Sequence, residues 1–289
     1  MYYAFVVNPV AGNGYALLTM NRLEETLKTR GAEYRIFHTE KPGHATEIAL
    51  RLSSDPEAAI VASVGGDGTA GEVAAGLVNT SKPFGIIPAG TGNDYIKSCG
   101  IPNDPMKALE ILLSGRTVLT DTGYVNDLFF LNVCGTGFDV TVLDYAENEK
   151  EKHRGLLPYF LGLVKAIFHY RPVHLAIRAD GIDEEGDYLI CSVANGRFIG
   201  GGIPICPLAE VDDGKLDLVL IRNIPRWKIP FYLPGLMLSK ALNFKVTRHF
   251  RVNEARIRGG KLRVNIDGEI RSMSEVSFKI NPSSLNLIR

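Results

Sequence analysis

The sequence predicts an α/β protein in which a doubly wound parallel sheet is followed by an antiparallel β-sandwich. Over about the first hundred residues, short apolar runs alternate with helical patterns, which is typical of βαβ units and a parallel sheet. After about Asp121, strand-like runs follow one another, separated by turns rich in Gly, Asp and Asn, as in an antiparallel sandwich. We therefore expect two domains, residues 1–121 and 122–280, with the C-terminal tail, residues 281–289, returning to the first.

The expected elements of the first domain follow from apolar periodicity and from glycines at helix ends. The run Ala58–Val64 is apolar apart from Ser63, which suits a parallel strand covered on both faces. The helical pattern Tyr15–Arg30 stops at Gly31, a residue type that commonly ends helices. The other expected strands are Tyr2–Val7, Glu33–Phe37 and Phe84–Ile87, and the other expected helices are His44–Leu52, Ala70–Val78, a short helix ending at Gly100, and Pro105–Ser114.

The second domain is expected to consist mainly of strands, with three helical insertions. Its expected strands are Asp127–Val133, His174–Arg178, Asp187–Ala194, Lys215–Ile221, Arg256–Arg258, Leu262–Ile266 and Val276–Ile280. The helical insertions are expected at Val140–His153, Pro158–Tyr170 and Trp227–Lys240.

Composition disfavours several classes of protein. Hydrophobic residues make up 45% of the chain and charged residues 22%, which is ordinary for a folded protein and argues against large disordered regions. The four cysteines are far apart and form no CxxC pair, so we expect reduced thiols in a cytoplasmic protein. The N-terminus resembles a first strand and not a signal peptide. No stretch reaches the roughly 18 apolar residues of a spanning helix, so any membrane contact is expected to be peripheral.

The net charge is zero, but the charge is unevenly distributed. From Arg222 to Arg271 there are twelve Lys or Arg residues against three acidic residues, an excess of nine. Such an excess fits a surface that rests on anionic lipid headgroups, and it also fits nucleic-acid binding or merely solvated strand faces. The sequence alone leaves these interpretations open.

Three loops of the first domain share the order strand, glycine turn, helix. They are Asn8–Gly14 (NPVAGNG), Gly65–Thr69 (GGDGT) and Gly90–Asp94 (GTGND). In a doubly wound sheet all three would gather at the carboxyl edge of the strands, where ligands bind. Glycine lets backbone N–H groups approach a phosphate, and the following helix adds its positive end. A single loop of this kind could be simple turn punctuation, but three at one edge predict a phosphate-binding site.

These loops match neither the P-loop GxxxxGK[ST] nor the dinucleotide motif GxGxxG, and they lack a phosphate-binding lysine. Phosphate is therefore expected to be held by backbone amides, Thr hydroxyls, a metal ion or basic residues from elsewhere. Thr69 and Glu72 have the T-x-x-E spacing of a capping box, which predicts where the helix after the second loop begins.

These motifs resemble the diacylglycerol kinase catalytic family, which includes bacterial diacylglycerol and phospholipid kinases, with sphingosine and ceramide kinases as relatives. The resemblance is carried by GGDGT, by the segment Gly85–Asp94 (GIIPAGTGND) and by the opening Asn8-Pro9-x-x-Gly12. The more distant NAD kinases have a similar GGDGT signature, whereas PAGTGND separates the lipid kinases from them. The resemblance spans nearly the whole chain. It implies a Rossmann-like ATP-binding domain, a lipid-kinase β-sandwich domain and a homodimer.

The resemblance also implies which residues bind ATP and Mg²⁺. Asp67 is expected in a metal-linked water network, and Asp94 and Asp121 are expected to order Mg²⁺ and the phosphates. Asn13 departs from the family pattern, because some bacterial members have a basic residue there. The implied nucleotide-binding set is Asn8, Thr39 (near the adenosine), Gly65, Gly66, Asp67, Gly68, Thr69, Gly90, Thr91, Asn93 and Asp94.

The segment Asp267-Gly268-Glu269 lies between two strand-like runs of the second domain. Asp-Gly is a common two-residue hairpin turn, so the segment could be a turn and nothing more. A kinase also needs a carboxylate that accepts the proton of the attacking hydroxyl, and the family has its catalytic carboxylates in a D-G-E motif. The resemblance therefore implies catalytic roles for Asp267 and Glu269, alongside Asp67, and leaves open which turn carboxylate is the base.

The acidic segment Glu210–Asp217 could be a polar turn that leads into a strand. Carboxylates in a tight turn can also converge on a hard divalent cation, and in the resembled family such a segment holds a structural Mg²⁺. This resemblance implies Glu210 and Asp213 as side-chain ligands and the Lys215 carbonyl as a third ligand. Asp217 is an alternative ligand that would point along the next strand.

Two segments, Leu156–Phe168 and Trp227–Leu238, are apolar nearly all round and rich in aromatic residues. Such segments are usually buried core. They could instead form a lipid-facing rim, with Arg222, Arg226 and Lys228 beside Trp227 at the headgroup level.

Together these features predict a cytoplasmic, peripherally membrane-associated kinase that uses ATP and Mg²⁺. Its expected reaction is phosphorylation of a hydroxyl on a membrane lipid, diacylglycerol first among the candidates, with no nucleic-acid partner. Two alternatives stay open: an NAD kinase-like small-molecule kinase, and a nucleotide-binding module that docks on membranes without catalysis.

Overall fold

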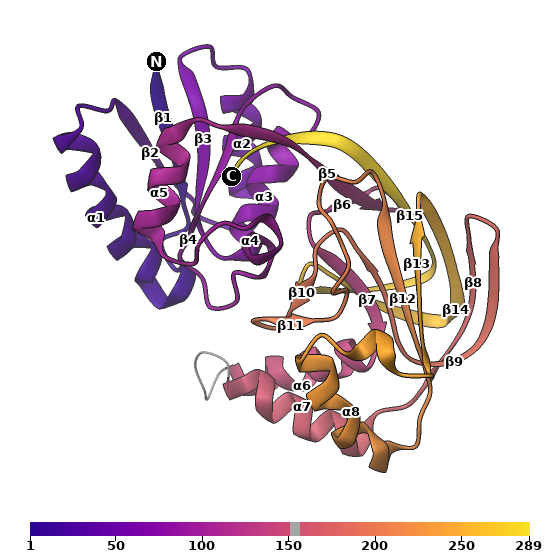
Figure 1. The fold of residues 1–289 in the computed structure, drawn as a ribbon. Coiled ribbons are helices and arrows are strands. Elements are labelled where there is room, and N and C mark those ends of the chain that lie inside the picture. The colour runs from indigo at the N-terminus through magenta and orange to yellow at the C-terminus, as the bar shows by residue number, and fades with distance from the viewer. Residues whose placement is uncertain (151–156) are drawn as a thin grey trace. The chain divides into compact units, whose positions relative to one another are not determined.

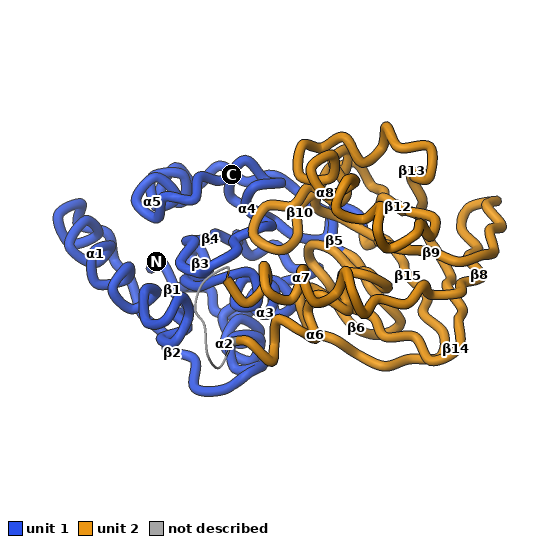
Figure 2. Tube along the Cα trace, turned by 90° about the horizontal axis from the view of Figure 1, so that it is seen from below, with its two compact units in different colours: residues 1–122, 282–289 blue, residues 123–281 orange. Residues whose placement is uncertain are grey.

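The structure, a computed structural model, describes residues 1–150 and 157–289. It divides into two compact units, which Figure 2 shows in different colours. Unit 1 consists of Met1–Thr122 together with Pro282–Arg289, and unit 2 consists of Gly123–Asn281. Among the described residues, no helix combines the length and the hydropathy that crossing a membrane requires.

Unit 1 is built on parallel strands formed by the apolar runs of the sequence. Four of them pair in the spatial order β2 (Tyr34–His38), β1 (Tyr2–Val7), β3 (Ala58–Gly65) and β4 (Phe84–Pro88). Seven of the eight residues of β3 are buried, as expected of a strand that is covered on both faces. The end of β15 (Glu269–Ile288) adds to β4 through the parallel pair of Leu287 and Phe84.

Helices cover both faces of this sheet (Figures 1 and 2). On one face lie α1 (Tyr15–Thr29) and α5 (Pro105–Ser114), and on the other lie α2 (His44–Ser53) and α3 (Asp67–Leu77). A short helix, α4 (Asp94–Cys99), follows β4. Helix α5 begins sharply because the Asp104 carboxylate accepts hydrogen bonds from two N–H groups of its first turn.

The C-terminal tail is bound to β5 (Thr117–Val125) within unit 1. The hydroxyls of Thr122 and Ser284 lie 2.8 Å apart, and the buried Asp121 carboxylate accepts a hydrogen bond from Ser283 N at 2.7 Å. These buried hydrogen bonds hold the tail against β5. They also satisfy polar groups that would be costly to bury without a partner.

Unit 2 consists mainly of antiparallel strands. The long strand β9 (Ile182–Ala194) pairs with β7 (Val133–Gly137), β8 (Val173–Ala179) and β12 (Leu216–Arg222). Its remaining strands are β6 (Leu128–Phe130), β10 (Phe198–Ile199), β11 (Ile203–Pro204), β13 (Thr247–Val252), β14 (Glu254–Ile266) and the first part of β15. Figure 1 shows three helices at one end of unit 2, namely α6 (Phe138–Lys150), α7 (Leu157–His169) and α8 (Ile229–Met237).

The structure differs from the expected elements at several places. The main sheet is mixed. Its parallel strand pairs lie in unit 1. Its antiparallel pairs are more numerous. The runs Arg256–Arg258 and Leu262–Ile266 form one strand, β14, since an irregularity in pairing lies between them and does not end the strand. Val276–Ile280 is the middle of the longer β15. The end of the expected helix Val140–His153 lies outside the described residues.

Helix α3 packs against α2 at Gly76, and this contact yields a stability prediction. A Cβ added at Gly76 would lie 2.7 Å from Thr46 O and 2.9 Å from Leu50 N. Gly76→Ala should therefore lower the free energy of unfolding by about 1–3 kcal/mol, because the helices must move apart. Chemical denaturation followed by circular dichroism measures this change.

Gly71→Ala is the matched control in the same helix, because a Cβ there meets nothing within 4 Å. It should leave stability unchanged or raise it by up to about 1 kcal/mol through helix propensity. Equal effects of the two substitutions would contradict the close contact between α2 and α3.

Candidate functional site

The three glycine-rich loops meet at the carboxyl ends of β1, β3 and β4 in unit 1. The Asn8 side-chain amide donates a hydrogen bond to Thr69 Oγ1 at 3.2 Å, which joins the first loop to the second. The main chains of Gly66 and Gly90 touch, which joins the second loop to the third. A Cβ added at Gly90 would lie only 2.3 Å from Gly66 Cα, so this contact requires glycine at position 90.

The first loop has an unusual main-chain conformation. Gly12, Asn13 and Gly14 are all left-handed, with φ of 59°, 57° and 87°, and only Gly and Asn adopt this conformation readily. A Cβ at Gly12 would lie 2.4 Å from the carbonyl oxygen of Ala89. The first loop therefore contacts the third through its main chain, without an intervening side chain.

The amino end of α3 lies in the second loop. The helix begins at Asp67, and its N-cap residue, Gly66, has no side chain that could cap it. The expected capping box is wrong: Thr69 Oγ1 accepts from Asn8, while Glu72 Oε2 accepts a hydrogen bond from Ala45 N in α2 at 3.1 Å. A helix end of this kind has unpaired N–H groups and a positive dipole, which together favour an anion.

The Asp67 carboxylate ties the second loop to α4. Its Oδ1 accepts hydrogen bonds from Asp94 N at 2.7 Å and Tyr95 N at 3.0 Å, at the start of that helix. Burial raises the pKa of Asp67; the hydrogen bond from Tyr95 lowers it, and the negative charge of the nearby Asp94 raises it. Two carboxylates thus lie close together beside the glycine loops.

Lys97 supplies a cation to this cluster, which the sequence analysis missed. Its Nζ lies 2.7 Å from Asp94 Oδ1 and donates to the carbonyl oxygen of Gly92 at 2.9 Å. Its positive charge also lowers the pKa of Asp67. The signal was present in the sequence, because residues three apart on a helix are neighbours and Asp94 and Lys97 have this spacing.

The remaining expected residues of unit 1 have different environments. Thr39 follows β2, and its N–H donates to Val7 O at 2.9 Å at the same sheet edge. Asn93 is buried and braces the third loop, since it exchanges hydrogen bonds with Gly90 and donates to Asn103 Oδ1. Gly65 ends β3, whereas Gly68 and Thr91 are exposed. The Asp121 carboxylate accepts a hydrogen bond from Ser283 N of the C-terminal tail.

In unit 2, Asp267 and Gly268 form the two-residue turn between β14 and β15. Both have positive φ, 48° and 99°, and Ile266 pairs with Glu269 across the turn, so the hairpin-turn interpretation is right. The Asp267 carboxylate also links this turn to the segment before β7. It accepts hydrogen bonds from three consecutive N–H groups, those of Leu131 at 2.5 Å, Asn132 at 3.0 Å and Val133 at 2.9 Å.

Glu269 has a different environment from Asp267. Its side chain is 71% exposed, and Oε2 accepts a hydrogen bond from the Arg271 guanidinium at 2.8 Å. Three N–H donors occupy the Asp267 oxygens and leave little capacity to accept a further proton, whereas Glu269 keeps free lone pairs. Of the two carboxylates, Glu269 is the more exposed and has fewer described hydrogen-bond donors.

A buried carboxyl, that of Asp139, is linked to this turn through the side chain of Asn265. Gly268 N donates to Asn265 Oδ1 at 2.8 Å, and the Asn265 side chain is hydrogen-bonded in turn to Asp139 at the start of α6. Asp139 Oδ1 is buried without a described hydrogen-bond partner. Burial raises the pKa of Asp139 from its ordinary value of 3.8 to about 6.

Two sets of residues were candidates for metal binding. The Asp67 and Asp94 carboxylates fit Mg²⁺, because that ion is commonly held by one or two carboxylates together with substrate phosphates. Among the described residues, no group of three or more His, Cys, Asp or Glu could hold a metal ion by itself. In the second set, Asp213 accepts from Lys215 N and is paired with the Arg251 guanidinium, while Glu210 is exposed. The ligand set Glu210, Asp213 and Lys215 stays a prediction.

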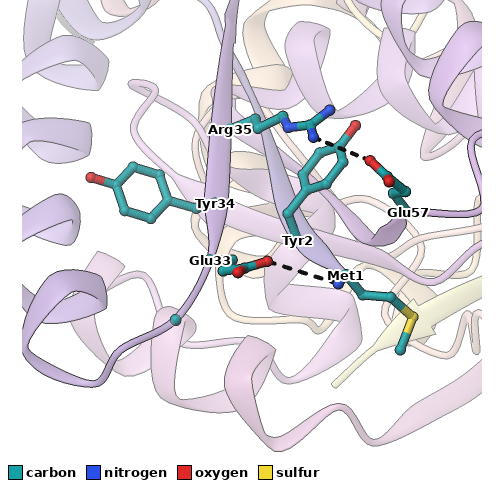
Figure 3. A pocket seen from close by; sticks show the side chains of 7 residues that line it. Met1, Tyr2, Glu33, Tyr34, Arg35 and Glu57 are labelled. Atoms are coloured by element: carbon teal, nitrogen blue, oxygen red, sulfur yellow. Dashed lines mark hydrogen bonds and ion pairs between the residues drawn. The ribbon is translucent and has the colours of Figure 1, made fainter.

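A pocket of about 500 Å³ lies at the opposite edge of the unit 1 sheet, at the amino ends of β1 and β2 (Figure 3). Its charged groups are paired with one another: Arg35 with Glu57 at 3.2 Å, and the Met1 amino group with Glu33 at 3.8 Å. The pocket contains none of the expected site residues and shares no lining residue with the glycine loops.

The buried Asp139 gives a prediction about pH. Because the folded protein holds this proton up to about pH 6 and the unfolded chain releases it near 3.8, the native protein loses stability as the pH rises through this interval. The Asp139→Asn variant has no titrating carboxyl at this position, so its stability should not fall in this way as the pH rises. Between about pH 4 and pH 7.5, the free energy of unfolding of Asp139→Asn should rise by roughly 2 kcal/mol relative to that of the native protein.

Urea denaturation of both proteins at the two pH values measures this difference. A stability difference that does not change with pH would contradict the buried, proton-holding state of Asp139.

Comparisons with known proteins match both parts of the chain to family models. The model of the diacylglycerol kinase catalytic domain matches residues 2–125. A second model, the YegS C-terminal NAD kinase beta sandwich-like domain, matches residues 132–289.

Relatives extend the match over the whole chain. A diacylglycerol kinase of Mycobacterium tuberculosis is 28% identical, with 98% of this chain and 94% of the relative covered. A "probable lipid kinase YegS-like" protein of Yersinia enterocolitica is 32% identical over 68% of each chain. The crystal structure of a diacylglycerol kinase from Bacillus anthracis has the same fold, with a TM-score of 0.75, 21% identity, and coverage of 99% of this chain and 96% of that chain. The chain therefore belongs to the diacylglycerol kinase catalytic-domain family and is a lipid kinase of that family.

Proposed function

We propose that this kinase transfers the γ-phosphate of ATP to a hydroxyl of a membrane lipid, and that the lipid is diacylglycerol, giving phosphatidic acid. The observation that carries the proposal is the meeting of the three glycine loops of unit 1 around Asp67, Asp94 and Lys97. The substrate follows from the relatives of Mycobacterium tuberculosis and Bacillus subtilis, each named diacylglycerol kinase.

Unit 1 is proposed to be the Rossmann-like, doubly wound ATP-binding domain. Its parallel strands end in the glycine loops, and ligands bind at this edge of such sheets. The main chain at Gly66 and Gly90 and the amino end of α3 would hold the phosphates, with Asn8, Thr69 and Thr91 beside them. Thr39, at the same edge, would lie toward the adenosine.

Asp67, Asp94 and Lys97 are proposed to organise the triphosphate. Mg²⁺, when bound, neutralises the charge that develops on the transferred phosphoryl group. The two carboxylates would hold the ion together with the phosphates, and the lysine would balance the carboxylates or contact a phosphate oxygen. Unlike the glycines, these three side chains carry full charges, so they should set the affinity for the metal–nucleotide complex.

Glu269 is proposed to be the base that accepts the proton of the lipid hydroxyl, with Asp267 holding the turn that presents it. The support is the contrast within one hairpin: Asp267 is occupied by three N–H groups, whereas Glu269 is exposed and is bonded only by Arg271 among the described contacts. The β-rich unit 2 is thus proposed as the lipid-kinase domain. Glu210, Asp213 and Lys215 are proposed to bind a second, structural Mg²⁺ there.

We place the enzyme at the cytoplasmic surface of the membrane. Its four cysteines are buried and form no disulfide, in keeping with a reducing compartment, and its proposed substrate lies in a bilayer. Incubation with labelled ATP and either diacylglycerol, a total lipid extract or NAD tests the proposal. Label in phosphatidic acid supports it. Label in NADP would indicate an NAD kinase-like enzyme, and label in another lipid would indicate a different lipid substrate. No labelled product at all would indicate a nucleotide-binding module without catalysis.

Glu269→Gln should lower kcat at least about 100-fold, because it removes the proton acceptor but changes no buried contact. Its free energy of unfolding should be unchanged, since the side chain is exposed. Asp267→Asn should lower stability by about 1–3 kcal/mol as well as activity, because an amide cannot accept from three N–H donors.

Glu275→Gln is the control for Glu269→Gln, because it removes another partly exposed glutamate of β15, paired with Arg258. It should keep full activity. Near-native kcat in Glu269→Gln would remove this residue from the mechanism.

Lys97→Gln should raise the KM for ATP and lower kcat/KM at least about tenfold, because it leaves Asp94 without its cation. Steady-state kinetics with varied ATP and saturating lipid measure the effect, and Lys97→Arg should restore part of it. Lys107→Gln, at an exposed position of α5, is the control and should behave like the native enzyme. Equal kinetic constants in the two variants would show that Lys97 does not act on the nucleotide.

A further inference from the structure

Helix α7 has an apolar row on the side that faces away from its core. Pro158, Gly162 and Ala166 are buried, and a Cβ at Gly162 would lie 2.5 Å from Val142 O in α6. The opposite row, Leu157, Phe160, Val164 and Phe168, has the 3–4-residue helical spacing and is exposed. An exposed helix face is normally polar, so this row needs a partner.

A second apolar group lies on the segment that contacts the end of α7. Trp227 and Phe231 are 68% and 75% exposed, and their rings pack edge to face with centroids 6.4 Å apart. The short helix η2 (Arg226–Lys228), which precedes α8, touches α7, since Arg226 Nη1 donates to Phe168 O at 3.2 Å. We call the surface formed by Leu157, Phe160, Val164, Phe168, Trp227 and Phe231 the α7–α8 face.

The charged side chains on the two segments that carry the α7–α8 face are all positive. Residues 157–172 and 222–253 contain no Asp or Glu. Arg171, Arg226, Lys240 and Lys245 are exposed, and no ion pair involves them among the described residues. On the adjoining α6, Asp144 and Glu149 are paired with Arg263 and Lys165. The face therefore combines aromatic residues with unneutralised cations.

We infer that the α7–α8 face is a docking surface for a bilayer that contains anionic lipids. Aromatic side chains enter the headgroup boundary, and cations beside them attract anionic headgroups. The Lys228 Nζ lies 5.2 Å from the centroid of the Trp227 ring, which places a cation beside an amphipathic ring as in interfacial belts. A second copy of the chain fits less well, because a two-fold contact would bring the same cations together.

This inference rests on the proposed function for its purpose, since a kinase that acts on diacylglycerol must reach a lipid surface. The binding itself needs neither ATP nor turnover. Binding and catalysis can therefore be measured separately.

Trp227 makes a direct test possible in the native protein, because it is the only tryptophan in the chain. On addition of phosphatidylcholine vesicles that contain phosphatidylglycerol, its emission should shift to shorter wavelength, and lipids brominated on their acyl chains should quench it. Vesicles of phosphatidylcholine alone should bind at least about tenfold more weakly, because about 1 kcal/mol per cation is lost. Emission unchanged by either kind of vesicle would overturn the inference.

Variants then identify the contributions of the face. Phe160→Ser with Phe168→Ser should weaken vesicle binding at least about tenfold, whereas Leu208→Ser, at a leucine 58% exposed elsewhere in unit 2, should not. Lys240→Gln with Lys245→Gln should weaken binding to the anionic vesicles about tenfold. Arg256→Gln with Lys279→Gln, exposed cations of β14 and β15, should have little effect. Equal effects of the test and control pairs would overturn the assignment.

Two further measurements distinguish a failure of this inference from a failure of the proposed function. Phosphorylation of a short-chain, water-dispersed diacylglycerol should be the same in the Phe160→Ser/Phe168→Ser variant and in the native protein, and a parallel loss of this activity would contradict a pure docking role. In sedimentation, the native protein and this variant should have the same oligomeric state. Dissociation of a native dimer by the variant would assign the face to a second copy instead.

Discussion

The contact between the main chains of Gly66 and Gly90 is the constraint on which the site in unit 1 depends. The two backbones can approach this closely only because residue 90 has no Cβ, which would lie 2.3 Å from Gly66 Cα. The contact brings the second and third loops together, so that the Asp67 carboxylate reaches the first N–H groups of α4. Asp94 and Lys97 then lie beside it on that helix. The charged groups of the site are thus positioned by two residues that have no side chain.

The acidic turn of unit 2 holds two carboxylates in different environments. Asp267 stabilises the turn because three N–H groups bind its oxygens, and Asn265 and Asp139 support it from beneath. Glu269 is two residues away and exposed. A stabilising turn and an exposed carboxylate are therefore not alternatives here, because neighbouring residues of one turn have different environments.

The sequence predicted what depends on local patterns. Glycine loops after apolar strands, the Asp-Gly turn and most helices follow from residue types at short spacing. The sequence did not predict contacts that depend on a residue far away in the chain. The capping box of Thr69 and Glu72 does not form, because Asn8 and Ala45 bind these side chains. Likewise, Asp267 lies 136 residues from Leu131, whose N–H it accepts, and no local pattern indicates such a contact.

If glycine contact between the second and third loops creates the nucleotide site, enlarging one glycine should abolish binding before any chemistry. Calorimetric titration of Gly90→Ala with a non-hydrolysable ATP analogue and Mg²⁺ tests this most directly, with the native protein and Gly71→Ala for comparison. The account predicts binding by the native protein and Gly71→Ala, and its loss in Gly90→Ala. Native-like affinity in a folded Gly90→Ala protein would contradict it.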